Sequence, residues 1–163
     1  MLNPGLVLFE EDSRLIDKEL QKLNQLSRAK VSFLVDKDGQ LIASIGETGD
    51  IDTTSLASLT AGNIAATGGM AQLLGEKEFS ILFHEGQRDN IHISLVGHRA
   101  ILVVVFDDRS SLGLIRLRVK RSVAALTAVL DQLTEKVAQS DSKQGASSPF
   151  QEITEEDIEN LFS

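Results

Sequence analysis

The sequence predicts an α+β domain whose five-stranded, mainly antiparallel sheet carries helices on both faces. Segments with helical spacing of apolar residues alternate with short β-rich segments, in the order helix, two strands, helix, three strands, helix. A second feature is residues 53–75, which contain no Asp, Glu, Lys or Arg although 25% of the chain is charged. A surface helix normally carries charges on its outer side, so we expect something other than water to cover this one.

The composition is that of one globular domain with additional tail segments. Of the 163 residues, 42% are hydrophobic, which is enough for a real core. The 24 acidic and 16 basic residues give a formal charge of -8, which repels phosphate backbones, so nucleic acid is not an expected partner. The absence of cysteine excludes disulfides, thiolate metal sites and cysteine nucleophiles.

Each element of the first half has a local signal. Residues 10–28 place Leu15, Ile16, Leu20, Leu23 and Leu26 at helical spacing among charges. Residues 30–35 and 40–45 are β-rich and flank Asp-Lys-Asp-Gly, whose Asp-Gly is a strong hairpin signal. The uncharged segment then begins after Asp52 or Thr53, either of which can cap a helix, and stops at Gly75.

The second half predicts three strands and a long helix. The strands are expected at 78–84, 90–96 and 99–106, and the unbroken apolar run ILVVVF marks the last one as a central strand covered on both faces. A helix capped by Ser110 or Ser111 should run to about residue 139. These elements end at about residue 139 and are followed by a Ser- and Gly-rich flexible linker at 140–149 and an acidic amphipathic tail at 150–163.

A helical wheel divides the uncharged helix into three lines at about 100° per residue. Two of them could pack on a sheet: one contains Ala57, Ala61, Ile64, Gly68 and Ala71, and the other contains Leu56, Thr60, Asn63, Thr67, Met70 and Leu74. The third, which should face outward, consists of Ser58, Gly62, Ala65, Gly69 and Gln72. Each interior glycine costs a helix about 1 kcal/mol relative to alanine, so Gly62, Gly68 and Gly69 indicate close approach of another backbone.

Two interpretations of this helix remain open at the level of the residues. In the first, another protein approaches a surface that contains Ser58, Ala61, Gly62, Ala65, Gly68, Gly69 and Gln72. In the second, the helix is buried in its own subunit and the glycines accommodate a neighbouring loop. The tail also has two interpretations. It either docks on a partner as a short capped helix or is a soluble, frayed end, and the residues that would dock are Phe150, Ile153, Ile158, Leu161 and Phe162.

Other chemistries find little support. Arg109 and a cluster at Arg116, Arg118, Lys120 and Arg121 could supply a catalytic arginine finger, but a solvated basic face is the simpler interpretation. The histidines His84, His92 and His98 are spread over different segments, which argues against a metal site. There is no G-x-S-x-G elbow and no Gly-Lys-Ser/Thr phosphate loop. No active site, metal or cofactor is expected on this chain.

The opening MLNPGLVLFEEDSR lacks a basic region followed by a long apolar stretch, so no signal peptide is expected. The uncharged run is too rich in Thr, Ser, Asn, Gln and Gly to favour a membrane span. We therefore expect a cytoplasmic protein without integral membrane association.

The strings DTTSLASLTAGNIAATGGMAQLLGE, FLVDKDGQLI and LVVVFDDRSSLGLIRLR, in this element order, resemble the Roadblock/dynein light-chain domain family over roughly residues 6–139. The ending SSPFQEITEEDIENLFS is similar to the tail of bacterial members that act on a Ras-like GTPase. The resemblance implies a homodimer with edge-to-edge sheets and paired central helices that form a platform for a small GTPase.

The bacterial relatives further imply GTPase activation in cell polarity or motility at a cell pole, by remodelling of the GTPase rather than by a donated arginine. In that case GTP and Mg²⁺ belong to the partner, Ala65 and Gly69 face it, and the tail assists nucleotide exchange. The alternative function is a passive scaffold of the same fold.

Overall fold

The computed structural model describes residues 10–143 of the chain, and its elements follow the predicted order. The helices and strands are α1 (Glu10–Ser27), β1 (Val31–Asp36), β2 (Leu41–Gly46), α2 (Thr53–Leu73), β3 (Ile81–Glu85), β4 (Asn90–Val96), β5 (Ala100–Phe106) and α3 (Leu112–Lys143). All strand pairs are antiparallel, in the spatial order β2-β1-β5-β4-β3. The predicted α+β fold with one five-stranded sheet is therefore confirmed.

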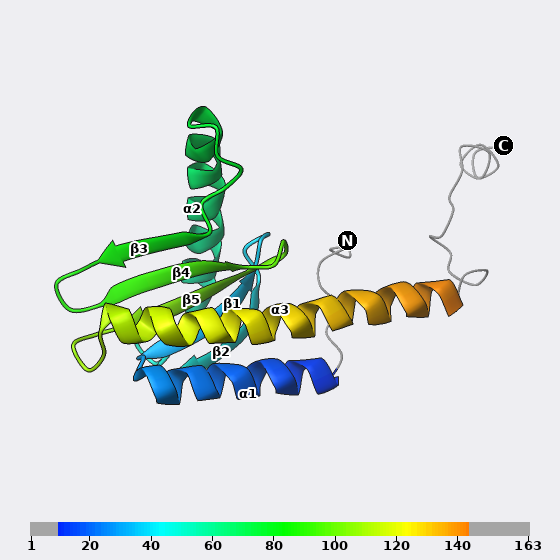
Figure 1. The fold of residues 1–163 in the computed structure, drawn as a ribbon. Coiled ribbons are helices and arrows are strands. Elements are labelled where there is room, and N and C mark those ends of the chain that lie inside the picture. The colour runs from blue at the N-terminus through cyan, green and yellow to red at the C-terminus, as the bar shows by residue number, and fades with distance from the viewer. Residues whose placement is uncertain (1–9, 144–163) are drawn as a thin grey trace.

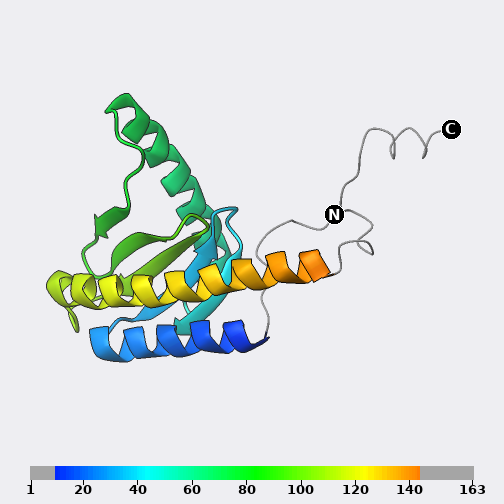
Figure 2. The same cartoon turned by 45° about the vertical axis from the view of Figure 1, so that its right-hand side comes forward.

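The sheet carries helices on both faces, but they are distributed unequally (Figure 1). Helices α1 and α3 lie side by side across one face, whereas α2 alone stands on the other face. Turning the molecule shows that α2 leans away from the sheet toward its C-terminal end (Figure 2). Strand β5, at the centre, is buried along its whole length, as its uninterrupted apolar run predicts.

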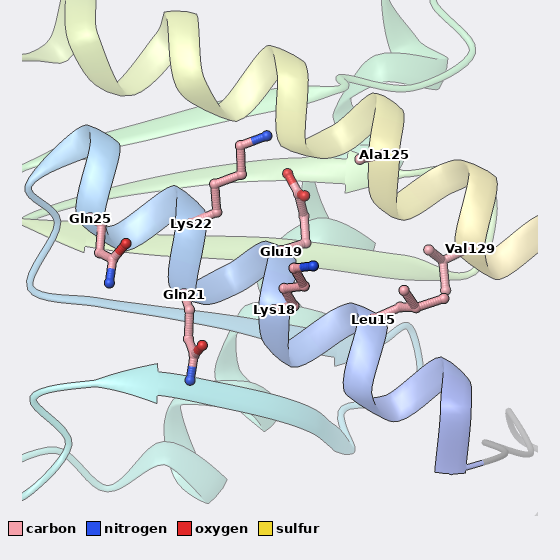
Figure 3. Close-up of a pocket in the computed structure, with 8 residues that line it drawn as sticks. All are labelled: Leu15, Lys18, Glu19, Gln21, Lys22, Gln25, Ala125 and Val129. Atoms are coloured by element: carbon pink, nitrogen blue, oxygen red, sulfur yellow. The ribbon is translucent and has the colours of Figure 1, made fainter.

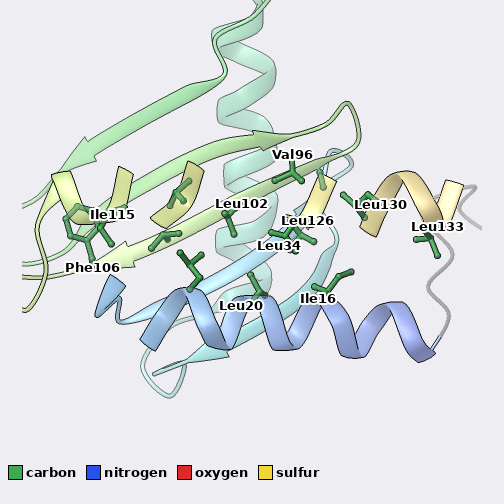
Figure 4. Close-up of a cluster of buried hydrophobic side chains, with 14 residues drawn as sticks. Ile16, Leu20, Leu34, Val96, Leu102, Phe106, Ile115, Leu126, Leu130 and Leu133 are labelled. Atoms are coloured by element: carbon green, nitrogen blue, oxygen red, sulfur yellow. The ribbon is translucent and has the colours of Figure 1, made fainter. Parts of the chain in front are cut away.

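The larger core lies between the sheet and the α1–α3 layer (Figure 4). Helix α1 contributes Ile16, Leu20 and Leu23, and α3 contributes a longer stripe that includes Leu126 and Leu133. Alternate residues of the strands point to the opposite face and form a second cluster, which α2 enters mainly with Ala57. Leu56, Ala61 and Ile64 of α2 pack against this cluster but are only partly buried, so α2 buries less apolar surface than α1 or α3 does.

Two details of the helices differ from the sequence expectation. In α1, Leu15 and Leu26 are exposed, whereas Asp12 is fully buried and accepts from the Lys136 Nζ at 3.2 Å on its Oδ1 atom. This pair joins the beginning of α1 to the end of α3.

The N-cap of α3 is Ser111, one of the two predicted candidates. Its Oγ accepts from the Leu114 N–H at 3.2 Å.

Helix α3 runs to Lys143, so the first four residues of the expected linker, 140–143, belong to the helix. The rest of the linker and the tail residues Phe150, Ile153, Ile158, Leu161 and Phe162 lie outside the described residues. Their docking stays a prediction.

Candidate functional site

Capping residues define where helix α2 begins and ends, since its sequence has no amphipathic pattern. The Asp52 carboxylate accepts from the Ser55 N–H at 3.1 Å and from the Ser55 hydroxyl at 2.7 Å, which caps the first turn. These bonds lower the pKa of Asp52 below its ordinary value. At the other end Gly75 adopts a φ of +78°, a left-handed conformation that glycine tolerates best. The chain then turns back toward β3.

Only part of α2 is packed on its own protomer. Ala57 and Thr60 are buried near the sheet, and Ala71 is buried near the returning chain, where its carbonyl accepts from the Glu76 N–H at 2.9 Å. The remaining positions are exposed or half-buried. The C-terminal half of the helix extends past the sheet in both views (Figures 1 and 2).

The predicted outward line is exposed along its whole length, at Ser58, Gly62, Ala65, Gly69 and Gln72. Ala61 and Gly68, beside that line, are half-buried. A Cβ atom built at Gly62, Gly68 or Gly69 would meet no atom within 4 Å. Within residues 10–143, no loop therefore lies in contact with these three positions, which favours the interpretation in which another protein approaches them.

A hollow of about 460 Å³ lies beside the C-terminal half of α2. Five of the seven predicted site residues line it, namely Ala61, Ala65, Gly68, Gly69 and Gln72. The opposite wall includes Phe79 and Leu95, and Lys37, Lys77 and Glu78 supply charges. Ser58 lies apart, next to Gly39 of the β1–β2 turn, and Gly62 is open to solvent.

The line that begins with Leu56 packs on the sheet only in its first half, where Leu56 contacts the second cluster and Thr60 is buried. Met70 and Leu74 of the same line are 58% and 72% exposed because the helix has already passed the sheet at that level. Leu59 and Leu73 were not singled out, yet they are 71% and 88% exposed. Together with Met70 they form an apolar strip beside the small-residue line. The sequence signal that could have revealed this strip is the absence of charged residues on the helix side that carries Leu59 and Leu73.

Strand β3 is an edge of the sheet: β4 is its single neighbour in the sheet order. Its Ile81 side chain is 54% exposed. On the α2 side, the His84 Nε2 and Asn63 Nδ2 atoms lie 2.9 Å apart, which connects β3 to the middle of α2. An open edge next to an apolar helix surface is a template for pairing with another chain.

The candidate arginine finger is engaged on the protomer itself. Arg109 donates to both carboxylate oxygens of Glu47, at 3.0 and 3.2 Å, and its Nε donates to Asp107 at 3.0 Å. These bonds hold the pKa of both carboxyls below their ordinary values. The geometry favours a surface ion-pair network at Arg109 over a side chain poised to enter another protein.

The histidines share no site. His92 is buried under α3 with its Nδ1 atom 3.3 Å from the Ser94 hydroxyl, and burial, followed by the charge of Arg116, lowers its pKa below the ordinary value. His84 and His98 are exposed elsewhere. Among the described residues no group of three or more His, Asp or Glu is placed to hold a metal ion.

A further groove, of about 490 Å³, separates α1 from α3 (Figure 3). Leu15 and Val129 form its apolar part, and long polar side chains of α1, including Lys18, Glu19 and Lys22, surround it. Its mixed charges do not select one kind of ligand. Within residues 10–143, no helix is long and apolar enough to cross a membrane.

Comparison with known proteins identifies the fold and the relatives of this chain. A family model described as the Roadblock/LC7 domain matches residues 15–106. The structure of Myxococcus xanthus MglB is 54% identical, with 78% of this chain and 96% of that chain covered and a TM-score of 0.74. The gliding protein MglB of Thermus thermophilus is 31% identical, with coverage of 80% and 99% and a TM-score of 0.76. A third structure, described as MglB with a tetrameric arrangement, is 30% identical, with coverage of 81% and 99% and a TM-score of 0.77.

Proposed function

This chain belongs to the Roadblock/LC7 domain family, and we propose that it is a homodimeric regulator that activates a Ras-like small GTPase of the MglA type. The observation that carries the proposal is the outer side of α2. An exposed, charge-free helix keeps three glycines that no contact among the described residues requires. These glycines cost about 3 kcal/mol of helix stability, which a docking surface for another backbone explains and a solvated helix does not.

The homodimer accounts for the apolar strip and the open edge together. Pairing of two β3 edges would extend the sheet and bring two α2 helices alongside each other, burying Leu59 and Leu73. Sedimentation equilibrium tests this arrangement. Leu59→Asp and Leu73→Asp should weaken the dimer, whereas Leu117→Asp, at an exposed leucine of α3, should leave it unchanged. A dimer indifferent to both α2 substitutions would contradict the arrangement.

The paired helices then offer the small-residue line and its adjoining hollow to one GTPase. We propose that Ala65 and Gly69 contact the GTPase and that contact reshapes it so that its own residues reach catalytic positions. The ion pairs of Arg109 support a mechanism without an arginine finger. GTP and Mg²⁺ are bound by the GTPase alone, and this chain contributes no catalytic group.

We further propose that the protein acts in the cytoplasm, concentrated at a cell pole, in a polarity or motility system, which its similarity to MglB supports. The tail, with Phe150, Ile153, Ile158, Leu161 and Phe162, is proposed to contact the GTPase away from the α2 surface and to assist nucleotide exchange. Deletion of residues 149–163 should therefore leave the dimer intact and alter exchange. Exchange rates identical to those with the full chain would remove this role.

Single-turnover GTP hydrolysis by the cognate GTPase, with and without this chain, tests activation directly. Acceleration should survive Arg109→Ala and Arg116→Ala and vanish in Gly69→Arg. Gly113→Arg is the matched control, because Gly113 is also a helical glycine with open space around it but lies on α3. If the GTPase binds and hydrolysis is unchanged, the protein is a passive scaffold of the same fold and the activator proposal fails.

A further inference from the structure

A groove of about 440 Å³ opens on the face of the sheet opposite α2, between the β3–β4 hairpin and the first half of α3. We call it the β3–α3 groove. Ile81 of β3 and Val119 and Val123 of α3 give it apolar walls, and His92 and Ser94 of β4 line it from the sheet. Its lining is more strongly apolar than that of the α1–α3 groove.

Two cationic side chains line this groove, Arg116 and Lys120 of α3. Among residues 10–139, no carboxylate forms a salt bridge with either of them. The buried Nε2 atom of His92, which also lines the groove, has no hydrogen-bond partner among the described residues. Unpaired cations in a chain of net charge -8 indicate that an acidic group belongs beside them.

The chain itself contains a segment of matching chemistry. Residues 150–163 include five acidic side chains and no basic one: Glu152, Glu155, Glu156, Asp157 and Glu159. At helical spacing Ile158, Leu161 and Phe162 share one face. We propose that this tail docks in the β3–α3 groove, with these apolar side chains between Ile81 and Val119 and its carboxylates beside Arg116 and Lys120.

The tail can reach the groove of its own protomer. Lys120 precedes Lys143, the last described residue of α3, by a helical path of about 35 Å. Ten extended residues from Lys143 to Ile153 span about 33 Å, and the residues beyond add about 1.5 Å each if helical. Ile158 and Leu161 therefore arrive at the groove without any change in α3.

Docking of the tail requires no GTPase, so it can fail or succeed independently of the proposed function. Any partner that binds the tail must first remove it from the groove. The apparent affinity of the tail for such a partner is therefore its intrinsic affinity multiplied by the fraction of molecules in which the tail is undocked.

The absence of Trp and Tyr from the chain allows a clean test in the full-length protein. In Phe162→Trp, the single tryptophan should show blue-shifted emission and protection from a soluble quencher. Arg116→Glu with Lys120→Glu should weaken docking about tenfold and expose the tryptophan. Lys18→Glu with Lys22→Glu, the matched charge reversal in the α1–α3 groove, should have no effect. Circular dichroism verifies that each variant is folded.

Hydrogen exchange provides a second readout without substitutions in the groove. Deletion of residues 150–163 should speed amide exchange in β3 and in residues 116–123 and leave α2 unchanged. A solvent-exposed tryptophan in the otherwise unaltered chain would overturn the proposal, as would exposure caused by the α1–α3 reversal alone. Blue-shifted emission that is lost on dilution would assign the groove to the tail of another copy and overturn docking within one protomer.

Discussion

Replacement of Gly69 by arginine should stabilise the isolated protein and at the same time abolish its activation of a GTPase. Gly69 lies in the exposed C-terminal half of α2, and a Cβ built there meets no atom within 4 Å. Within the part of the chain that the structure describes, no atom therefore opposes a larger side chain. The proposed partner, in contrast, must approach the helix backbone at this position.

The expected gain follows from helix propensity. Arginine ranks close to alanine, and glycine is about 0.8–1 kcal/mol less favourable than alanine in a helix interior. For a protein of this size that gain raises the melting temperature by about 2–4 °C. Gly69→Ala should give a similar rise, with a smaller loss of activation because a methyl group intrudes less.

Urea unfolding followed by circular dichroism, at concentrations below dimer formation, measures the gain, and single-turnover hydrolysis measures activation. Gly113→Arg should leave activation intact, since Gly113 lies on the far side of the sheet on α3. A Gly69→Arg protein less stable than the unaltered chain would show that Gly69 is packed after all. Full activation by a folded Gly69→Arg protein would refute the α2 platform.

Three further predictions concern other parts of the fold. Gly46→Ala should cost about 2 kcal/mol or more in urea unfolding, because φ is +120° and the new Cβ would lie 2.5 Å from a backbone carbonyl oxygen, whereas Gly49→Ala, with open space, should be nearly neutral. The pKa of buried His92 is lowered, so as the pH falls the unfolded chain binds a proton at this residue before the folded chain does. The contribution of His92 to the free energy of unfolding should therefore be constant above the ordinary pKa of 6.5 and decline below it. His92→Gln should reduce this decline in pH-dependent unfolding, and His98→Gln, at an exposed histidine, should not. Arg109→Ala should leave GTPase activation in place, whereas a finger arginine would account for about 10³-fold or more of the hydrolysis rate.

The strands could be predicted well because their signals are local. An Asp-Gly turn defines the β1–β2 hairpin, and its Gly39 indeed adopts a φ of +93°. The continuous apolar run of β5 leaves no polar face, so it must lie at the centre of the sheet with layers on both sides. Such features depend on neighbouring residues alone.

The surface of α2 could be predicted only in part. Its small-residue line was recognisable from the periodicity, and the structure places it outward. The exposure of Met70 was not, because the helical period alone does not say where the sheet beneath the helix ends. Burial of Asp12 was missed for a related reason: its partner Lys136 lies on a helix far away in sequence.

The sequence by itself therefore determined the element order, the central position of β5 and a charge-free helix with an unusual glycine content. Only the tertiary structure decided that, among the described residues, the glycines of α2 leave open space around them, and that a strip of leucines lies beside them. It also decided that Arg116 and Lys120 of α3, which form no salt bridge within the described part of the chain, flank an apolar groove. These properties depend on which surfaces the packing of sheet and helices leaves uncovered, and that is a relation between distant segments which no local pattern encodes.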